Sequence, residues 1–152
     1  MRRKEKEITD KTEIEEIIAK SSICRIALAV DNEPYLVPLC FGYLNNTLYF
    51  HSADEGRKLE MIKMNPRVCF EFEGDTEIIK AKKACNWGLK YRSVIGFGNA
   101  RIIEDEAERM TALDAIMNQY SNEKWDYAPS MLTKTLVFKI EIDTMTGKKA
   151  SE

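Results

Sequence analysis

Residues 23–52 read ICRIALAVDNEPYLVPLCFGYLNNTLYFHS, and this stretch decides the fold class. Its apolar runs are rich in residues that favour β-strands, and the segments DNEP (31–34) and NNT (45–47) are typical of tight turns. The pattern predicts an antiparallel meander of three strands, at residues 23–31, 35–44 and 48–52. Pro38 falls inside the second of these strands. Because proline cannot donate a ladder hydrogen bond, we expect this position at a sheet edge, a bulge or an opening.

The rest of the chain predicts further strands and three helices. Runs of β-forming residues predict strands at residues 67–73, 76–82, 93–103 and 136–143. Apolar periodicity predicts helices at residues 11–20, 55–64 and 104–120. Asp10 and Glu13 have the capping-box spacing expected at the start of the first helix. Six or seven antiparallel strands with few helices indicate a mainly β, α+β fold, and a small barrel is favoured because closure removes exposed edge strands.

Composition and charge exclude several classes of protein. The chain has 152 residues, of which 44% are hydrophobic and 32% are charged, as in an ordinary globular domain. Lys plus Arg number 23 and Asp plus Glu number 25, and the net charge of −2 argues against duplex nucleic acid as the main partner. No apolar stretch is long enough to span a membrane, and the charged N-terminus has no apolar signal region, so we expect a cytoplasmic protein.

The number and spacing of the cysteine and histidine residues limit which metal sites the chain could form. The four cysteines, Cys24, Cys40, Cys69 and Cys85, are scattered, and we expect buried free thiols in a reducing compartment. The single histidine, His51, excludes zinc sites built on paired histidines, and no Cys-x-x-Cys spacing replaces them. The sequence therefore predicts no metal site.

The segment HSADEGRK (51–58) carries the strongest signal for a ligand. It predicts a strand end, a short loop and the start of a helix whose first residues are Arg57 and Lys58. Two cations beside the positive end of a helix are unfavourable, by about 0.3–1 kcal/mol each. A bound phosphate reverses that balance and recruits both cations, together with the hydroxyl group of Ser52. Gly56 would let the backbone approach the anion closely.

A simpler interpretation of the same segment stays open at this point. Asp54 and Glu55 are adjacent and could neutralise the two cations on an exposed turn. The familiar nucleotide-binding motifs are absent, since neither GxxxxGK[ST] nor GxGxxG occurs, and Gly96-Phe97-Gly98 is a strand with two glycines.

The ordered motifs resemble a known family. Residues 37–72 read VPLCFGYLNNTLYFHSADEGRKLEMIKMNPRVCFEF. This segment resembles the flavin-binding split-barrel superfamily, which pyridoxamine 5'-phosphate oxidases typify. Within this superfamily, the chain more closely resembles the nitroimidazole-resistance (Nim-type) flavoproteins. That likeness lies in the segments YRSVIGFGNARIIEDEAERMTALDAIMNQY (91–120) and TGK (146–148). The resemblance covers the chain from about Ile14 to Lys148. It implies a six- to seven-stranded antiparallel split β-barrel with flanking helices. We therefore expect a single flavin-binding domain over residues 1–152, with 1–8 as a frayed N-terminus and 148–152 as a tail.

The resemblance also implies a cofactor and the residues that hold it. Such proteins are homodimers with FMN in a groove between the subunits, and FAD is a possible substitute. VPLCF (37–41) would run beside the isoalloxazine ring, and Gly98 would leave space there. The expected cofactor contacts are Val37, Pro38, Leu39, Cys40, Phe41, His51, Ser52, Gly56, Arg57, Lys58, Arg92, Ser93 and Trp125. Arg57 and Lys58 would clamp the phosphate, and Trp125 would cover the ring from the partner chain.

The implied activity is an FMN-dependent oxidoreductase. NADH or NADPH would reduce the flavin, which would reduce a small acceptor such as a nitroaromatic compound. His51 is the candidate proton donor, placed against Ser52 in the cofactor groove, although a lone histidine is more often structural. Two alternatives stay open: a flavin or haem carrier without turnover, in which His51 could ligate haem, and a deazaflavin-dependent reductase. The C-terminal segment LVFKIEIDTMTGKKASE (136–152) lacks the substrate-binding arginine and histidine of true pyridoxamine-phosphate oxidases, so oxidation of vitamin B6 is not expected.

Overall fold

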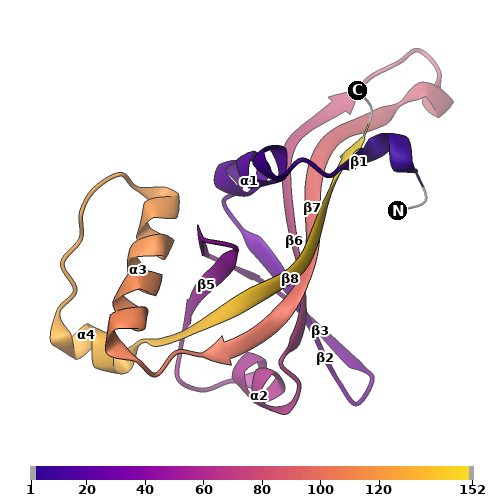
Figure 1. The fold of residues 1–152 in the computed structure, drawn as a ribbon. Coiled ribbons are helices and arrows are strands. Elements are labelled where there is room, and N and C mark those ends of the chain that lie inside the picture. The colour runs from indigo at the N-terminus through magenta and orange to yellow at the C-terminus, as the bar shows by residue number, and fades with distance from the viewer. Residues whose placement is uncertain (1–2, 151–152) are drawn as a thin grey trace.

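The computed structural model describes residues 3–150, except for the side chains of Met131, Thr133 and Lys134, and consists of one curved antiparallel sheet flanked by helices (Figure 1). The strands are β1 (Glu7–Ile8), β2 (Cys24–Val30), β3 (Glu33–Leu39), β4 (Gly42–Leu44), β5 (Thr47–Ser52), β6 (Arg67–Ile79), β7 (Gly88–Ile102) and β8 (Leu136–Ala150). The α-helices are α1 (Lys11–Lys20), α2 (Arg57–Met64), α3 (Glu106–Tyr120) and α4 (Pro129–Lys134). Single 3-10 turns lie at Lys4–Lys6 and Ala84–Asn86. The mainly β split-barrel class is confirmed.

The strand order places the split of the barrel between β3 and β4. The order across the sheet is β3-β2-β6-β7-β8-β5-β4, so β3 and β4 are its two ends, and β1 pairs with β8. Pro38 lies on β3, which confirms the predicted edge position. Both hairpins of the predicted meander form, β2 with β3 and β4 with β5, but they do not join into one meander, because β5 continues the sheet through β8. The strand predicted at 35–44 is interrupted at Cys40 and Phe41, where the chain crosses from one end of the sheet to the other.

Three other boundaries differ from the sequence prediction. The strands predicted at 67–73 and 76–82 are one strand, β6, because a register shift between Gly74 and Glu77 accommodates the turn-forming residues without ending the pairing with β7. Most of the predicted tail, 148–150, belongs to β8, and residues 151–152 lie outside the described part. Residues 7–8 of the predicted frayed end form β1 and pair with Gly147 and Lys148, which leaves Ile8 only 2% exposed. Residues 1–2 also lie outside the described part.

Local sequence signals explain the helix starts. The Asp10 carboxylate accepts a hydrogen bond from the Glu13 N–H (2.9 Å) at the start of α1, as its spacing predicts. Asp105 accepts in the same way from the Glu108 N–H (2.8 Å) at the start of α3. The sequence prediction missed α4, which lies in the predicted loop between α3 and β8. In residues 3–150, no helix is long and apolar enough to cross a bilayer.

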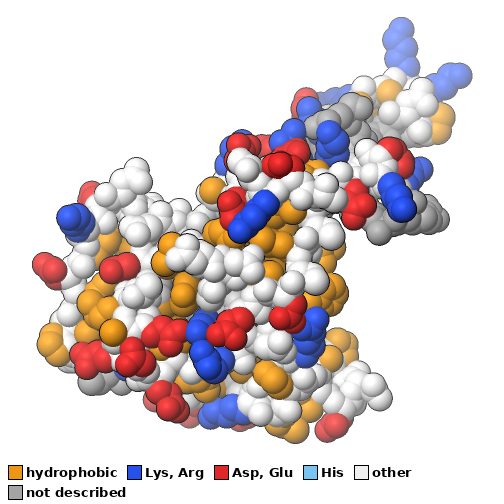
Figure 2. Space-filling model, viewed as in Figure 1, with side chains coloured by type: hydrophobic (Ala, Val, Ile, Leu, Met, Phe, Trp, Pro, Cys, Tyr) orange, Lys and Arg blue, Asp and Glu red, His pale blue; other side chains and the backbone are white. Residues whose placement is uncertain are grey.

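The core lies inside the curved sheet and is rich in phenylalanine. The largest fully buried side chains include Phe41, Phe50, Phe70, Phe72 and Phe138. The rings of Phe50 and Phe138 stack across the β5–β8 pair, with centroids 4.9 Å apart. On the surface, hydrophobic side chains emerge in several places between charged ones (Figure 2).

The expectation of buried thiols is wrong for two of the four cysteines. Cys24 is buried and Cys69 is half-buried, whereas Cys40 and Cys85 are exposed, and all four are free. Cys40 follows the edge strand β3, and Cys85 lies in the turn between β6 and β7, so neither is covered by the sheet. Burial raises the pKa of the Cys24 thiol and, to a smaller degree, that of Cys69.

These positions predict the order in which thiols react. In flavin-free protein at neutral pH, we expect Cys40 and Cys85 to be alkylated at least about tenfold faster than Cys24, because reaction needs both access and the thiolate form. Peptide-resolved mass spectrometry after timed iodoacetamide treatment measures each rate. Alkylation of Cys24 at the rate of Cys85 would contradict the fold.

Candidate functional site

The N-terminus of α2 is open to a ligand. Gly56 precedes the helix with φ 122°, a conformation that favours glycine, and its carbonyl accepts hydrogen bonds from the N–H groups of Leu59 (3.0 Å) and Glu60 (3.2 Å). Among the described residues, no side chain caps this helix. Of the N–H groups in the first turn, those of Arg57 and Lys58 therefore remain available to an acceptor from outside. Gly56 thus has a conformational role besides the expected close approach to an anion.

Arg57 and Lys58 contact aromatic rings rather than carboxylates. The Arg57 guanidinium lies 5.1 Å from the centre of the Tyr35 ring on β3, and the Lys58 ammonium lies 5.7 Å from that of Phe138 on β8. Within residues 3–150, neither cation forms an ion pair, so Asp54 and Glu55 do not neutralise them. Partial burial lowers the pKa of Lys58, because burial disfavours its charged form.

Ser52 lies on the same side of the sheet as Lys58. It is the last residue of β5 and lies two positions after Phe50, so both side chains point to one face. Phe50 stacks on Phe138, the ring that Lys58 covers. A hydroxyl, a guanidinium, an ammonium and free helix N–H groups thus surround one corner of the barrel. This donor set, with two positive charges and no carboxylate paired to them, fits a phosphate group.

The strand expected beside the flavin ring, VPLCF (37–41), divides between the two faces of the sheet. Val37 and Leu39 are partly buried against the core, whereas Pro38 and Cys40 are exposed on the other face. Phe41 is fully buried, with its ring 4.8 Å from that of Phe72, so only its main chain remains near the surface. The Arg57 contact with Tyr35 joins this strand to the start of α2.

His51 and Ser52 are adjacent on β5, and their side chains point to opposite faces of the sheet. His51 lines a cavity of about 220 Å³ on the α3 side of the sheet. The other residues lining this cavity are Leu113, Ile116, Met117, Tyr127, Leu132 and Thr135.

A single chain does not bring the other predicted cofactor residues to this corner. Ser93 is buried on β7, opposite Glu73 and Lys148, and Arg92 pairs with Glu13 at 3.5 Å. Ser93 lies five residues along β7 from Gly98, which is roughly 17 Å at about 3.4 Å per residue. Gly98 itself pairs with Val68, close after α2.

Gly98 and Trp125, which were expected beside the isoalloxazine ring, contact other parts of the chain. A Cβ atom on Gly98 would come 2.3 Å from the Glu141 carbonyl oxygen, so this glycine allows close pairing of β7 and β8 rather than making room for a ligand. Trp125 is 44% exposed beyond α3, beside a pocket that Asp114, Met117 and Asn118 also line.

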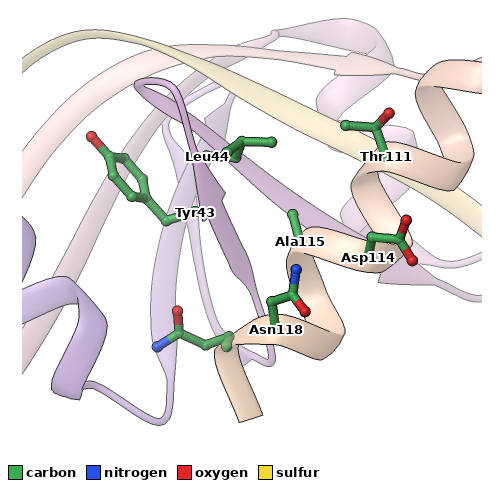
Figure 3. Close-up of a pocket in the computed structure, with 7 residues that line it drawn as sticks. Tyr43, Leu44, Thr111, Asp114, Ala115 and Asn118 are labelled. Carbon is green, nitrogen blue, oxygen red and sulfur yellow. The ribbon is translucent and has the colours of Figure 1, made fainter. Parts of the chain in front are cut away.

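A separate open pocket of about 330 Å³ lies between β4 and α3 (Figure 3). Tyr43 and Leu44 line it from the strand, and Thr111, Asp114, Ala115 and Asn118 line it from the helix. It contains none of the predicted cofactor residues. Among the residues that the structure describes, no cluster of histidine, cysteine or carboxylate side chains could hold a metal ion.

Sequence reasoning missed two tyrosines at or near this site. Tyr35 places its ring beneath Arg57, and the Tyr120 hydroxyl accepts a hydrogen bond from the Phe41 N–H at 3.0 Å. An aromatic residue two positions before VPLCF is a signal that could have drawn attention to Tyr35. Tyr120 ends an amphipathic helix 79 residues from Phe41, and no local pattern links the two.

Comparisons with known proteins show the family and the fold of this chain. The model of a family described as pyridoxamine 5'-phosphate oxidase matches residues 10–149. A proposed 5-nitroimidazole antibiotic resistance protein from Bacteroides thetaiotaomicron has a similar structure, with a TM-score of 0.84 and 34% identity over 96% of this chain and 90% of that one. The FAD- and haem-binding protein of Mycobacterium smegmatis has the same fold, with a TM-score of 0.85 and 21% identity over 97% of this chain and 74% of that one.

A curated relative covers a smaller region. An uncharacterized protein of Rhizobium meliloti is 28% identical over 64 residues, and the match spans 42% of this chain and 42% of the relative.

Proposed function

This chain belongs to the pyridoxamine 5'-phosphate oxidase family, and we propose that it is a flavin-dependent oxidoreductase that holds FMN by the N-terminus of α2. The observation that carries the proposal is the pair Arg57 and Lys58, which contact rings and have no carboxylate partner within residues 3–150. Such a pair is costly at a helix N-terminus unless an anion is bound. The terminal phosphate of FMN matches this corner, and FAD remains a possible alternative because named relatives bind it.

We further propose that two copies of the chain form the complete site. One row of residues crosses the outer face of the sheet from Leu36 through Ala27 and Cys69 to Phe97. Leu36 is 63% exposed and Phe97 is 42% exposed, and Ile95, in the next row, is 47% exposed. An apolar face of this kind is typical of a surface that another protein covers. The row begins on β3, so a second copy on this face would lie beside VPLCF and could supply Arg92, Ser93 and Trp125.

The residues of this chain would bind and orient the cofactor rather than react. Arg57, Lys58 and Ser52 would hold the phosphate, and the edge of β3 would offer backbone groups to the ring. FMN, when bound, supplies the redox chemistry that carries reducing equivalents from NADH or NADPH to a small acceptor. The relative from Bacteroides thetaiotaomicron supports a nitroaromatic acceptor. The role of His51 as proton donor stays a prediction, because its side chain lies in a cavity on the other face of β5 from Ser52.

The absorption spectrum and anaerobic reduction test this proposal. We expect freshly purified protein to show the spectrum of an oxidised flavin, NADH or NADPH to bleach it without oxygen, and a nitroaromatic compound to restore it. Acid-released cofactor identifies FMN or FAD by chromatography. A Soret band would favour the haem carrier and a deazaflavin spectrum the deazaflavin-dependent reductase. A flavin that neither nicotinamide can bleach would contradict the oxidoreductase.

A further inference from the structure

The last turn of α3 contacts two segments that lie far from it in sequence. The Gln119 side-chain amide donates to the carbonyls of Ile18 (3.2 Å), Ala19 (3.1 Å) and Ser21 (3.0 Å) at the end of α1. The neighbouring Tyr120 hydroxyl donates to the Ser22 carbonyl at 2.9 Å. The end of α3 is therefore fixed to the connection between α1 and β2.

Tyr120 also holds the point where the chain crosses the split of the barrel. Its hydroxyl oxygen accepts a hydrogen bond from the Phe41 N–H at 3.0 Å, and the two rings meet edge to face, with centroids 6.4 Å apart. Phe41 lies between β3 and β4, which are at opposite ends of the sheet. Its N–H therefore bonds to a side chain where a strand residue would bond to a neighbouring strand.

The chemistry of the phenol suits this bridge. Burial raises the pKa of Tyr120 to about 12, and the hydroxyl is protonated at neutral pH, as that of an ordinary tyrosine also is. It can then donate to Ser22 and accept from Phe41 at the same time, as both distances require. The bridge holds the segment after Leu39, where Cys40 is exposed.

We propose that Tyr120 is a positioning residue for the flavin, because its hydroxyl fixes the end of the strand VPLCF (37–41). This inference rests on the proposed function, in which that strand lies beside the isoalloxazine ring. Tyr120 acts through the Phe41 main chain and need not touch the cofactor. Loss of the hydroxyl leaves the Phe41 N–H without its partner and lets residues 40–41 move, while the core contact of Phe41 with Phe72 is kept.

The test compares Tyr120→Phe with Tyr127→Phe in the full chain. Tyr127 is a matched control, since its hydroxyl also donates one hydrogen bond, to Asp114 at 3.1 Å, away from β3. We expect Tyr120→Phe to bind FMN about tenfold more weakly, because the Phe41 N–H loses its acceptor and the strand end is less ordered. We also expect Cys40 in the flavin-free variant to be alkylated about fivefold faster, with Cys85 and Cys24 unchanged. Tyr127→Phe should match the wild type in both measurements.

The cysteine readout separates this inference from the proposed function. If the wild type binds no flavin, the proposed function fails, and faster hydrogen exchange of the Phe41 amide in Tyr120→Phe, together with the change at Cys40, still shows that Tyr120 positions the strand end. The amide measurement is needed because the Cys40 thiol also interacts with the Tyr120 hydroxyl directly. Unchanged Cys40 alkylation and FMN affinity in Tyr120→Phe would overturn the inference. An equal acceleration at the buried Cys24 would also overturn it, because that result indicates general loosening of the barrel rather than a local effect.

Discussion

Replacing Arg57 and Lys58 together by alanine is expected to weaken FMN binding by at least about 100-fold. Each charge-assisted hydrogen bond to phosphate contributes about 1.5–3 kcal/mol, and the lower value applies to Arg57 because its side chain is exposed. The sum of about 3 kcal/mol corresponds to roughly two orders of magnitude in the dissociation constant. The variant should fold, since Arg57 is exposed, Lys58 is only half-buried, and neither forms an ion pair within residues 3–150. Titration with FMN, followed by quenching of flavin fluorescence, measures the affinity.

Lys63→Ala is the matched control for this experiment. Lys63 is an exposed cation in the last turn of the same helix, so its removal changes the net charge without reaching the N-terminus. We expect less than about a twofold change in its FMN affinity, because an exposed charge several residues away is strongly screened. An Arg57→Ala, Lys58→Ala variant that keeps the affinity of the wild type would remove the basis of the phosphate site.

Gly42→Ala is expected to destabilise the protein by about 3 kcal/mol, the upper end of the range for overpacked cores. A Cβ atom at this position would lie 2.3 Å from the carbonyl carbon of Ala115 and 2.4 Å from the nitrogen of Ile116. These are main-chain atoms of α3, so no side chain can rotate away and the whole helix must shift from β4. Urea unfolding followed by circular dichroism measures the free energy of unfolding.

Gly74→Ala shows whether that effect is specific to the crossing of α3 over β4. Gly74 lies at the register shift of β6, and a Cβ atom there would meet nothing within 4 Å. We expect its free energy of unfolding to change by less than about 1 kcal/mol. Equal stability of the two variants would mean that α3 does not pack against Gly42 as described.

Local patterns predicted the elements whose causes are local. The start of α1 follows from the Asp10 cap, and the turn after β2 follows from Asp31 and Asn32, both of which have positive φ. The edge position of Pro38 follows from its missing N–H. Prediction failed at Gly74 and Asp75, where turn-forming residues signal an end to the strand and the structure shows only a register shift. Pairing with β7 on both sides of the shift outweighs that local preference.

In the candidate site, too, sequence analysis grouped the residues that are close in sequence and missed the contacts that depend on tertiary packing. Ser52, Gly56, Arg57 and Lys58 are near one another in sequence, so a strand–loop–helix pattern was enough to bring them together. The contact of Arg57 with Tyr35 and the separation of His51 from Ser52 depend on how β3, β5 and α3 pack. Arg92, Ser93 and Trp125 share no corner with α2 in one chain, and their assignment depends on a second copy.

The sequence by itself determined most of the strands and the three longer helices, the open edge at Pro38 and the two cations at the start of α2. Each of these depends on interactions within a few residues, where backbone geometry and charge act directly. Only the tertiary structure decided that the chain crosses the barrel split between Leu39 and Gly42, and that Tyr120 holds Phe41 there from 79 residues away. A hydrogen bond over that separation forms only after the sheet has brought α3 against β4, and no local preference of either residue specifies it.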